Sequence, residues 1–435
     1  MLTNNDAGPA GTLARPDIAD HTAALATVTT LFFMWGFLTS LNDILVPHLK
    51  SIFDLNYAEV MLIQFAFFSA YFIFSIPSAK LIDRIGYQKS IVIGLLTMAL
   101  GAALFVPAAS VPSFPLFLSA LIILAAGITA LQVAANPYVT VLGPAKTSSS
   151  RLNLTQAFNS LGTTIGPFLG GLLILSAAPK SSDEVRRMSA QAVQAYRLHE
   201  ASSVKLPYLG ICFALVVLSL VIARAALPPI PQAQRQRTNG SSAAMESVWH
   251  FRQLVLGAVA IFVYVGAEVA IGSFLVNYLG QPSIGNLAAS VAARYVSVYW
   301  FGAMVGRFIG SAVLRRVHTG KLLGIAAIAA GILVLTSMAT SGNVAMWSIL
   351  LVGLCNSIMF PSIFALGVAG LGPLTGDGAG ILVMAIVGGA IIPELQGALA
   401  DHVGIHRAFI LPVLCYLYIL YYALRGSRPA AGTET

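Results

Sequence analysis

The stretch PLFLSALIILAAGITALQVAANPY, residues 115–138, contains no charged side chain. At about 1.5 Å of rise per residue, an α-helix of roughly 20 residues spans the hydrocarbon core of a lipid bilayer. A continuous helix also satisfies its own backbone N–H and C=O groups, which lipid cannot do. The stretch therefore predicts a transmembrane helix, and it carries two amide side chains, Gln132 and Asn136.

The rest of the chain contains eleven further stretches of this kind, separated by short polar segments. They cover residues 24–49, 60–81, 91–109, 152–175 and 206–226 in the first half, and residues 254–279, 292–313, 322–340, 346–367, 378–399 and 409–424 in the second half. Each is long enough to cross a bilayer. The sequence therefore predicts an all-α membrane protein with twelve transmembrane helices.

The composition agrees with membrane insertion, because only 9% of the residues are charged and 57% are hydrophobic. A soluble protein carries about 25% charged residues. The net charge of +8 does not indicate nucleic-acid binding, since the basic residues form no continuous patch with interleaved aromatic side chains. Cys212, Cys355 and Cys415 each lie in an apolar run, so we expect buried thiols and neither a disulfide framework nor a metal site.

The basic residues fall in alternate connections between the predicted helices. They are Arg84 and Lys89, Lys146 and Arg151, Arg235, Arg237 and Arg252, and Arg315, Arg316 and Lys321. Cytoplasmic loops are enriched in Lys and Arg, so this pattern places both termini in the cytoplasm. The acidic start of the chain has no basic region leading into an apolar core, and we expect a polar tail there and no cleaved signal.

A polar segment, residues 228–250, divides the chain into two similar halves. The expected organisation is a cytoplasmic tail (1–23), a six-helix bundle (24–227), this cytoplasmic linker, a second six-helix bundle (251–425) and a tail (426–435). Short motifs recur in order between the halves: residues 33–36 correspond to 263–266, and 166–167 to 392–393. Parallel repeats of this kind predict a substrate site at the midplane between two halves that rock against each other.

Several motifs resemble those of a known family. AKLIDRIGYQK, residues 79–89, is similar to the loop motif of the major facilitator superfamily. LNDIL at 41–45, AANPYVTVLGP at 134–144 and RLNLTQAFNS at 151–160 resemble the fucose–proton symporter branch. The resemblance runs from about residue 30 to 424. It implies the major facilitator fold and secondary transport of a monosaccharide with a proton in the bacterial cytoplasmic (inner) membrane, by a monomer without a cofactor.

The resemblance also implies roles for individual residues. The branch's proton-binding aspartate matches Asp43, and its sugar-contacting asparagine matches Asn159. Departures occur at Gln132, where the fucose symporter has its second essential acid, at Glu268, where an amide is usual, and at Phe360, where a tyrosine is usual. With these departures, the set of residues is more similar to the bacterial glucose/galactose transporter members of the branch. A hexose of that type is therefore the expected substrate.

Three acids lie within the predicted spans: Asp43, Glu268 and Glu394. An ionised acid at the centre of a membrane helix costs about 2.5–3.5 kcal/mol, so each needs a reason to be there. Burial favours the neutral form of a carboxyl group, as a proton carrier requires. We expect Asp43 and Glu268 to couple transport to protons. The alternatives are a helix-end role for Asp43 and a structural pair between Glu268 and Arg294; pairing with Arg294 is the expected role of Glu394.

Sugar recognition requires amides for hydrogen bonds and aromatic faces for the C–H surface. The candidates are Asn42, Gln132, Asn136, Gln156, Asn159 and Asn356, with Trp35 and Phe360 as the aromatic groups. Gln132 and Asn136 share one helix face, and Gln156 and Asn159 share another, because residues three or four apart lie on the same side. Hydrogen bonding between helices is the alternative role for any of these amides.

Four charged loop residues, Asp83, Arg84, Arg315 and Arg316, are predicted to form an inner gate through salt bridges and helix-end contacts. A purely topogenic role in the positive-inside pattern is also consistent with their positions. The chain shows no nucleophile–base set, metal-ligand cluster or phosphate-binding loop, so an enzyme is not expected. Sodium coupling and export of another small polar metabolite remain alternatives to proton-driven sugar import.

Overall fold

The computed structural model of the protein describes residues 18–53, 57–111, 113–174, 184, 187–228 and 248–428. Within the helices, the described side chains do not include residues 18–21, 41–53, 57–61, 167–174 and several positions between 190 and 203. Most of the predicted linker (229–247) and most of the two predicted tails (1–17 and 429–435) lie outside the described residues.

The first half of the chain supplies six long helices. They are α1 (Ile18–Phe53), α2 (Tyr57–Ile85), α3 (Tyr87–Ser110), α4 (Phe114–Val141), α5 (Ser148–Ile174) and α8 (Lys205–Arg224), with a short 3-10 turn, η1 (Ala145–Thr147), before α5. These helices follow the six predicted apolar stretches. Most extend a few residues beyond the predicted ends, since the helical backbone continues into the polar flanks of each apolar run.

The second half also supplies six spans, and three of them are interrupted. The continuous ones are α9 (Arg252–Leu279), α10 (Ala289–Val313) and α11 (Thr319–Ala339), preceded by η2 (Val248–His250). The interrupted ones are α12 (Gly342–Asn356) with α13 (Met359–Gly367); η3 (Gly372–Leu374), α14 (Thr375–Met384), η4 (Ala385–Val387) and α15 (Gly388–Val403); and α16 (Ile405–Ala408), α17 (Ile410–Tyr421) and the π-helical η5 (Tyr422–Gly426).

Eleven segments of the described chain are long and apolar enough to cross a membrane. The remaining predicted span forms α5, a helix of 27 residues whose side chains are described only up to Gly166. No strand occurs among the described residues. The predicted all-α membrane architecture is therefore confirmed, while α7 (Ala190–Ser203) is a helix that the sequence analysis did not predict.

The helix of the tenth span is interrupted just before a proline. Pro361 has no N–H, so it cannot bond to the carbonyl of Ser357 four residues earlier. α12 ends at Asn356 and α13 starts at Met359. The carbonyl oxygens of Asn356 and Ser357 instead accept hydrogen bonds from side chains on neighbouring spans, Tyr264 and Arg307. The interruption thus creates two polar acceptors in the middle of the C-terminal half.

Glycines allow α1 and α5 to cross at close range. A Cβ added to Gly36 would collide with the backbone carbonyl of Asn159, and a Cβ added to Gly162 would collide with the carbonyl of Phe33. Small residues at such crossings let two membrane helices approach until their backbones touch. This crossing sets the position of Asn159 against the first span.

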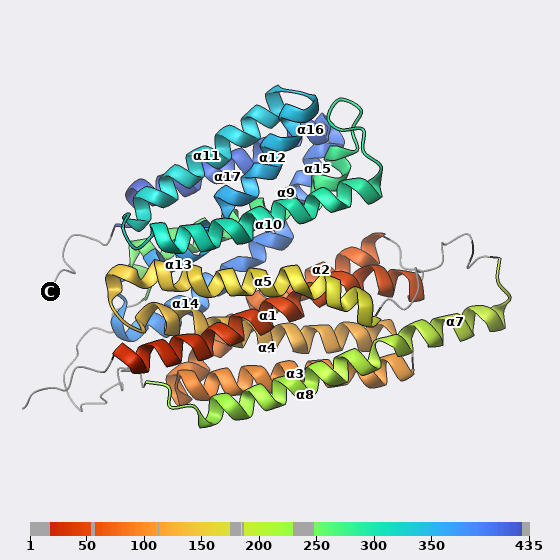
Figure 1. Cartoon of the computed structure of the whole chain (residues 1–435), viewed down its shortest axis with the longest axis horizontal. Helices are drawn as coiled ribbons and strands as arrows, with labels where there is room; N and C mark the ends of the chain where they lie inside the picture. Colours follow the sequence, from red (N-terminus) through yellow and green to blue (C-terminus); the bar gives the residue numbers. More distant parts are fainter. Residues whose placement is uncertain are drawn as a thin grey trace, which may run out of the picture.

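The two halves pack against each other mainly through two helix pairs, α5 with α10 and α2 with α14. Figure 1 shows α5 and α10 side by side. Ser150 Oγ donates to Ser311 O at 2.6 Å, and Thr319 Oγ1 donates to Ser149 Oγ at 2.9 Å. On the other pair, a Cβ at Gly380 would lie 2.8 Å from the Cβ of Ala79. These contacts lie at the end of the bundle that the charge pattern assigns to the cytoplasm.

Candidate functional site

Glu268 and Arg307 form a charged pair in the interior of the molecule. Glu268 lies near the middle of α9, and its Oε1 is 3.9 Å from Nη2 of Arg307 on α10; each side chain is 12% exposed. Tyr264, one helical turn before Glu268, donates its hydroxyl to the same Oε1 at 2.8 Å. Intramembrane charges are retained where they pair and face the bundle interior, and this pair does both.

Arg307 also bridges the two halves of the chain. Its Nη1 donates to Ser160 Oγ and, at 3.5 Å, to the carbonyl of Gln156, both on α5 of the other half. Its Nε donates at 3.2 Å to Ser357 O, the carbonyl that Pro361 leaves unpaired. A guanidinium presents five N–H donors in a fixed plane, which lets one side chain hold these groups together. Arg307 is the residue that the sequence analysis missed.

Three tyrosines from three spans surround Asn356. The Nδ2 group of Asn356 donates to Tyr299 Oη at 2.9 Å, and its Oδ1 accepts from Tyr416 Oη at 2.8 Å. The third tyrosine, Tyr264, donates to the Asn356 backbone carbonyl at 3.0 Å. Asn356 is fully buried. The structure therefore places this predicted sugar-binding residue in a network of intramolecular hydrogen bonds next to the charged pair.

The paired amides predicted in α4 and α5 lie together in the N-terminal half. Gln156 Nε2 points to Asn136 Oδ1 at 3.4 Å, and Gln132 Nε2 donates to Tyr71 Oη at 2.8 Å. All three amides are buried. The Nδ2 group of Asn136 is buried without a protein partner. Because buried donors are normally paired, this N–H is available to a ligand or to water.

Asn159 and the predicted aromatic ligands make their contacts with neighbouring apolar residues. Asn159 Nδ2 donates at 3.0 Å to the backbone carbonyl of Phe32, whose ring packs 5.1 Å from Trp35. Phe360 directly precedes Pro361 on α13 and lies 6.0 Å from Phe364 between ring centroids. Trp35 and Phe360 are both largely buried, with 7% and 8% of their surface exposed.

Asn42 and Asp43 belong to α1, but their side chains lie outside the described part of the structure. Their predicted roles therefore stay predictions. The alternative role considered for Glu268, a structural pair with Arg294, was wrong: Arg294 is exposed near the start of α10, and no ion pair joins it to Glu268 or Glu394 among the described residues. Thirteen residues of helix, about 20 Å of rise, separate Arg294 from Arg307.

The predicted gate residues lie at the end of the bundle that the charge pattern assigns to the cytoplasm. A Cβ added to Gly376, in the first turn of α14, would lie 3.4 Å from Asp83 Oδ1. A carboxylate next to the first turn of a helix is stabilised by the unpaired N–H groups there. Arg84, Arg315 and Arg316 are exposed, and within the described residues no ion pair involves them. The gating role of these four residues stays a prediction.

Together these groups form a polar path across the centre of the molecule. It runs from Asn136 through Gln156 and Arg307 to Glu268. The path combines amide donors, one carboxyl group and one guanidinium between apolar walls. Such a set can bind a neutral, hydroxylated molecule and change charge by one proton. The described residues contain no group of three or more His, Cys, Asp or Glu side chains placed to hold a metal ion.

Comparison with known proteins gives consistent matches over most of the chain. A family model, Major Facilitator Superfamily, matches residues 25–393. The glucose/galactose transporter of Brucella abortus biovar 1 (strain 9-941) is 54% identical over 405 residues, which is 93% of this chain and 94% of that protein. The L-fucose-proton symporter of Escherichia coli (strain K12) is 37% identical over 412 residues, with 93% of each chain covered.

A solved structure is also similar throughout. The crystal structure of a major facilitator superfamily transporter, FucP, in the outward conformation aligns with a TM-score of 0.85 at 35% identity. The alignment covers 93% of this chain and 98% of that one.

Proposed function

Since the chain belongs to the major facilitator superfamily, we propose that it imports a hexose of the glucose/galactose type together with a proton. The substrate class is supported by the 54% identity to a glucose/galactose transporter, and proton coupling by the 37% identity to an L-fucose-proton symporter. The proposed location is the bacterial inner membrane, with both termini in the cytoplasm and the monomer as the working unit.

The way the halves pack supports the proposal of alternating access. The α5–α10 and α2–α14 contacts close the end that we assign to the cytoplasm. Toward the opposite end of the helices, which we assign to the outer side, polar side chains such as Gln64, Asn277 and Glu394 are exposed. Polar groups within a membrane span face water-filled space more often than lipid. The arrangement is consistent with a carrier that is closed inside and open outside.

Sugar binding is proposed at the amides next to the interface between the halves. The unpaired Nδ2 of Asn136, together with Gln156 and Asn159, offers hydrogen-bond groups to sugar hydroxyls. Asn42 in α1 and Gln132 complete the proposed polar set, and Trp35 and Phe360 the apolar one. Asn356 acts on the sugar only indirectly, because its amide is already bonded to Tyr299 and Tyr416.

Proton coupling is proposed to work through the hydrogen bonds of Arg307. When Glu268 binds a proton from the outer side, the attraction between its carboxylate and the guanidinium is lost. Arg307 then retains its neutral partners, Ser357 in its own half and Ser160 and Gln156 in the other. Protonation of Glu268 therefore changes the interactions of Arg307, the side chain that links this carboxyl group to the opposite half. Asp43 in α1 is the proposed second proton-binding group.

The observation that carries the proposal is the position of Arg307 between Glu268 and α5. The test is uptake of labelled glucose and galactose into liposomes, with pH and sodium gradients imposed separately. Accumulation driven by an inward proton gradient supports the proposal. Accumulation that requires sodium, or efflux without uptake, would favour the two alternatives, a sodium-coupled symporter or an exporter.

A further inference from the structure

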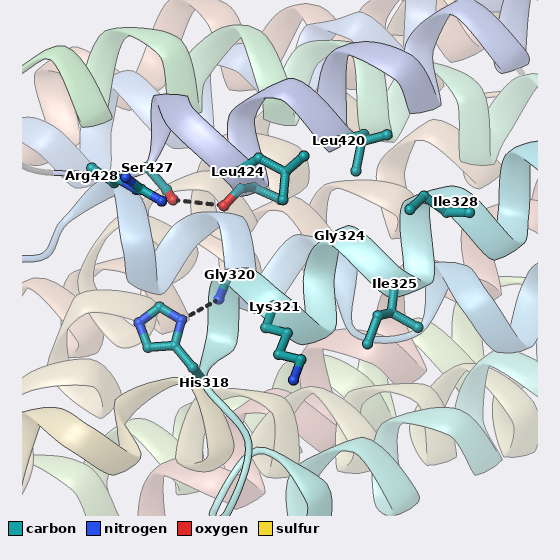
Figure 2. Close-up of a pocket in the computed structure, with 11 residues that line it drawn as sticks. His318, Gly320, Lys321, Gly324, Ile325, Ile328, Leu420, Leu424, Ser427 and Arg428 are labelled. Carbon is teal, nitrogen blue, oxygen red and sulfur yellow. Dashed lines mark hydrogen bonds between the residues drawn. The ribbon is translucent and has the colours of Figure 1, made fainter.

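A groove on the outer surface of the C-terminal half has no role in the transport path described above. It lies between α11 and the end of the last span, with a volume of about 330 Å³. Figure 2 shows His318 and Arg428 at one end of the groove, Leu420 and Ile328 at the other, and Lys321 along the α11 wall. The groove therefore has a cationic end and an apolar end.

The polar end lies where the spans leave the membrane at the predicted cytoplasmic side. Lys321 and Arg428 are both exposed. His318 caps α11: its Nδ1 accepts from the backbone N–H of Gly320 at 3.2 Å. In this neutral form the ring proton must sit on Nε2, so His318 adds a hydrogen-bond donor to the two cations.

The charge around this end is uncompensated in the sequence. No Asp or Glu occurs between Glu268 and Asp377, or between Asp401 and Glu434. Both walls of the groove come from these acid-free stretches, so no carboxylate of the lining neutralises Lys321 and Arg428. An anionic headgroup in the groove would therefore meet these positive side chains without competition from a lining carboxylate.

The other end of the groove suits a hydrocarbon chain. Ile325, Ile328 and Leu424 are each about half exposed, with relative exposures of 52%, 46% and 53%. Gly324 forms part of the floor; a Cβ there would meet Leu420 Cδ1 at 3.6 Å, an ordinary van der Waals distance. A free anion would gain nothing from this apolar surface, whereas an acyl chain would cover it.

We propose that the groove binds an anionic phospholipid of the cytoplasmic leaflet. The phosphodiester group contacts Lys321, Arg428 and Nε2–H of His318, and one acyl chain lies along the apolar end. Basic pockets between transmembrane helices on the cytoplasmic side are a recognised setting for anionic headgroups. Binding here would join the first helical turn of α11 to the end of the last span, outside the interface between the halves.

The test is native mass spectrometry of the purified full-length protein in a mild detergent, titrated with dioleoyl phosphatidylglycerol or dioleoyl phosphatidylcholine. We expect a one-to-one adduct with phosphatidylglycerol at concentrations where phosphatidylcholine gives none. The double variant Lys321→Gln/Arg428→Gln should bind about 25-fold more weakly, at roughly fivefold per basic side chain. Arg425→Gln is the matched control, because Arg425 is exposed three residues before Arg428, at the end of the last span, but does not line the groove.

A second variant tests the apolar end without touching the charges. Gly324→Leu places its Cβ at ordinary van der Waals distances from Leu420, Ala423 and Leu424 and fills the floor of the groove, so it should lose the adduct while keeping the melting temperature of the wild-type protein. Three results would overturn the proposal: equal adducts with both lipids, equal loss in Arg425→Gln and the double variant, or complete competition by inorganic phosphate. A protein dimer in place of the lipid-bound monomer would assign the groove to a second copy and overturn it as well.

Discussion

Nη2 of Arg307 lies 3.9 Å from Oε1 of Glu268 inside the C-terminal half. The same guanidinium donates to Ser160 on α5 of the other half and to the Ser357 carbonyl beside the Pro361 interruption. One basic side chain therefore connects the acid of α9 to the opposite bundle. A change in the charge of Glu268 acts directly on a contact that holds the two halves together.

The first prediction concerns the carboxyl group itself. Glu268→Gln keeps the shape of the side chain and an acceptor for Tyr264, but it cannot take up or release a proton. Accumulation of hexose in proteoliposomes under an inward proton gradient should fall about tenfold or more, within the usual range of coupling energies. Sugar counterflow, which needs no net proton movement, should persist. Glu394→Gln, at an exposed acid of α15, is the control and should accumulate sugar normally.

The second prediction concerns the acid in the first span. Asp43→Asn should abolish uphill uptake and leave counterflow at a measurable rate. The amide retains hydrogen-bonding groups, but it cannot bind and release a proton as a carboxyl group does. Radiolabelled uptake with and without an imposed pH gradient separates the two activities. Asp401→Asn, near the end of α15, serves as the control. Unchanged accumulation by Asp43→Asn would remove Asp43 from the coupling mechanism.

The third prediction addresses the link between the halves. Arg307→Lys keeps the positive charge, but an ammonium lacks the planar fork that reaches Ser160, Ser357 and Glu268 together. Each lost hydrogen bond to a charged group is worth roughly 1.5–3 kcal/mol, so the closed end should open in a larger fraction of molecules. Spin labels at Lys146 and Arg425, both exposed and on opposite halves, report the change as a longer distance population. An unaltered distance distribution would show that other contacts hold this end closed.

The fourth prediction is structural. Gly36→Ala places a methyl group against the backbone of Asn159, where the α1–α5 crossing leaves no room. Overpacking of this kind destabilises by about 1–3 kcal/mol, so the melting temperature of the purified protein should fall. At Gly210, in α8, an added Cβ meets nothing within 4 Å. Gly210→Ala should therefore melt at or slightly above the wild-type temperature, and an equal fall in both variants would argue against the crossing as the cause.

The spans could be predicted from the sequence because each transmembrane helix satisfies its backbone within itself, so a local apolar run is sufficient. The segment 115–138, for example, became α4 with only a few added residues. The helix α7 could not be found in the same way. Its residues are an even mixture of polar and apolar types, and neither length nor hydropathy distinguishes such a helix from a loop.

The site was only partly predictable, since pairing between distant helices depends on how the spans pack. Glu268 was identified from its position in an apolar run, but the only partner considered for it, in the alternative structural role, was Arg294 and not Arg307. Two signals pointed to Arg307: it is a basic residue inside a predicted span, and Pro361 leaves a carbonyl that needs a donor. The hydrogen bonds of Asn356 to Tyr299 and Tyr416 join three separate spans and left no local sequence signal.

The most direct test of proton-coupled sugar import is proton movement itself. Purified protein in liposomes that contain a pH-sensitive dye should acidify the lumen when glucose or galactose is added outside, without sodium and with no imposed gradient. The Glu268→Gln variant should give no such signal. Sugar entry without acidification in the wild-type protein, or acidification that appears only with sodium present, would contradict the account.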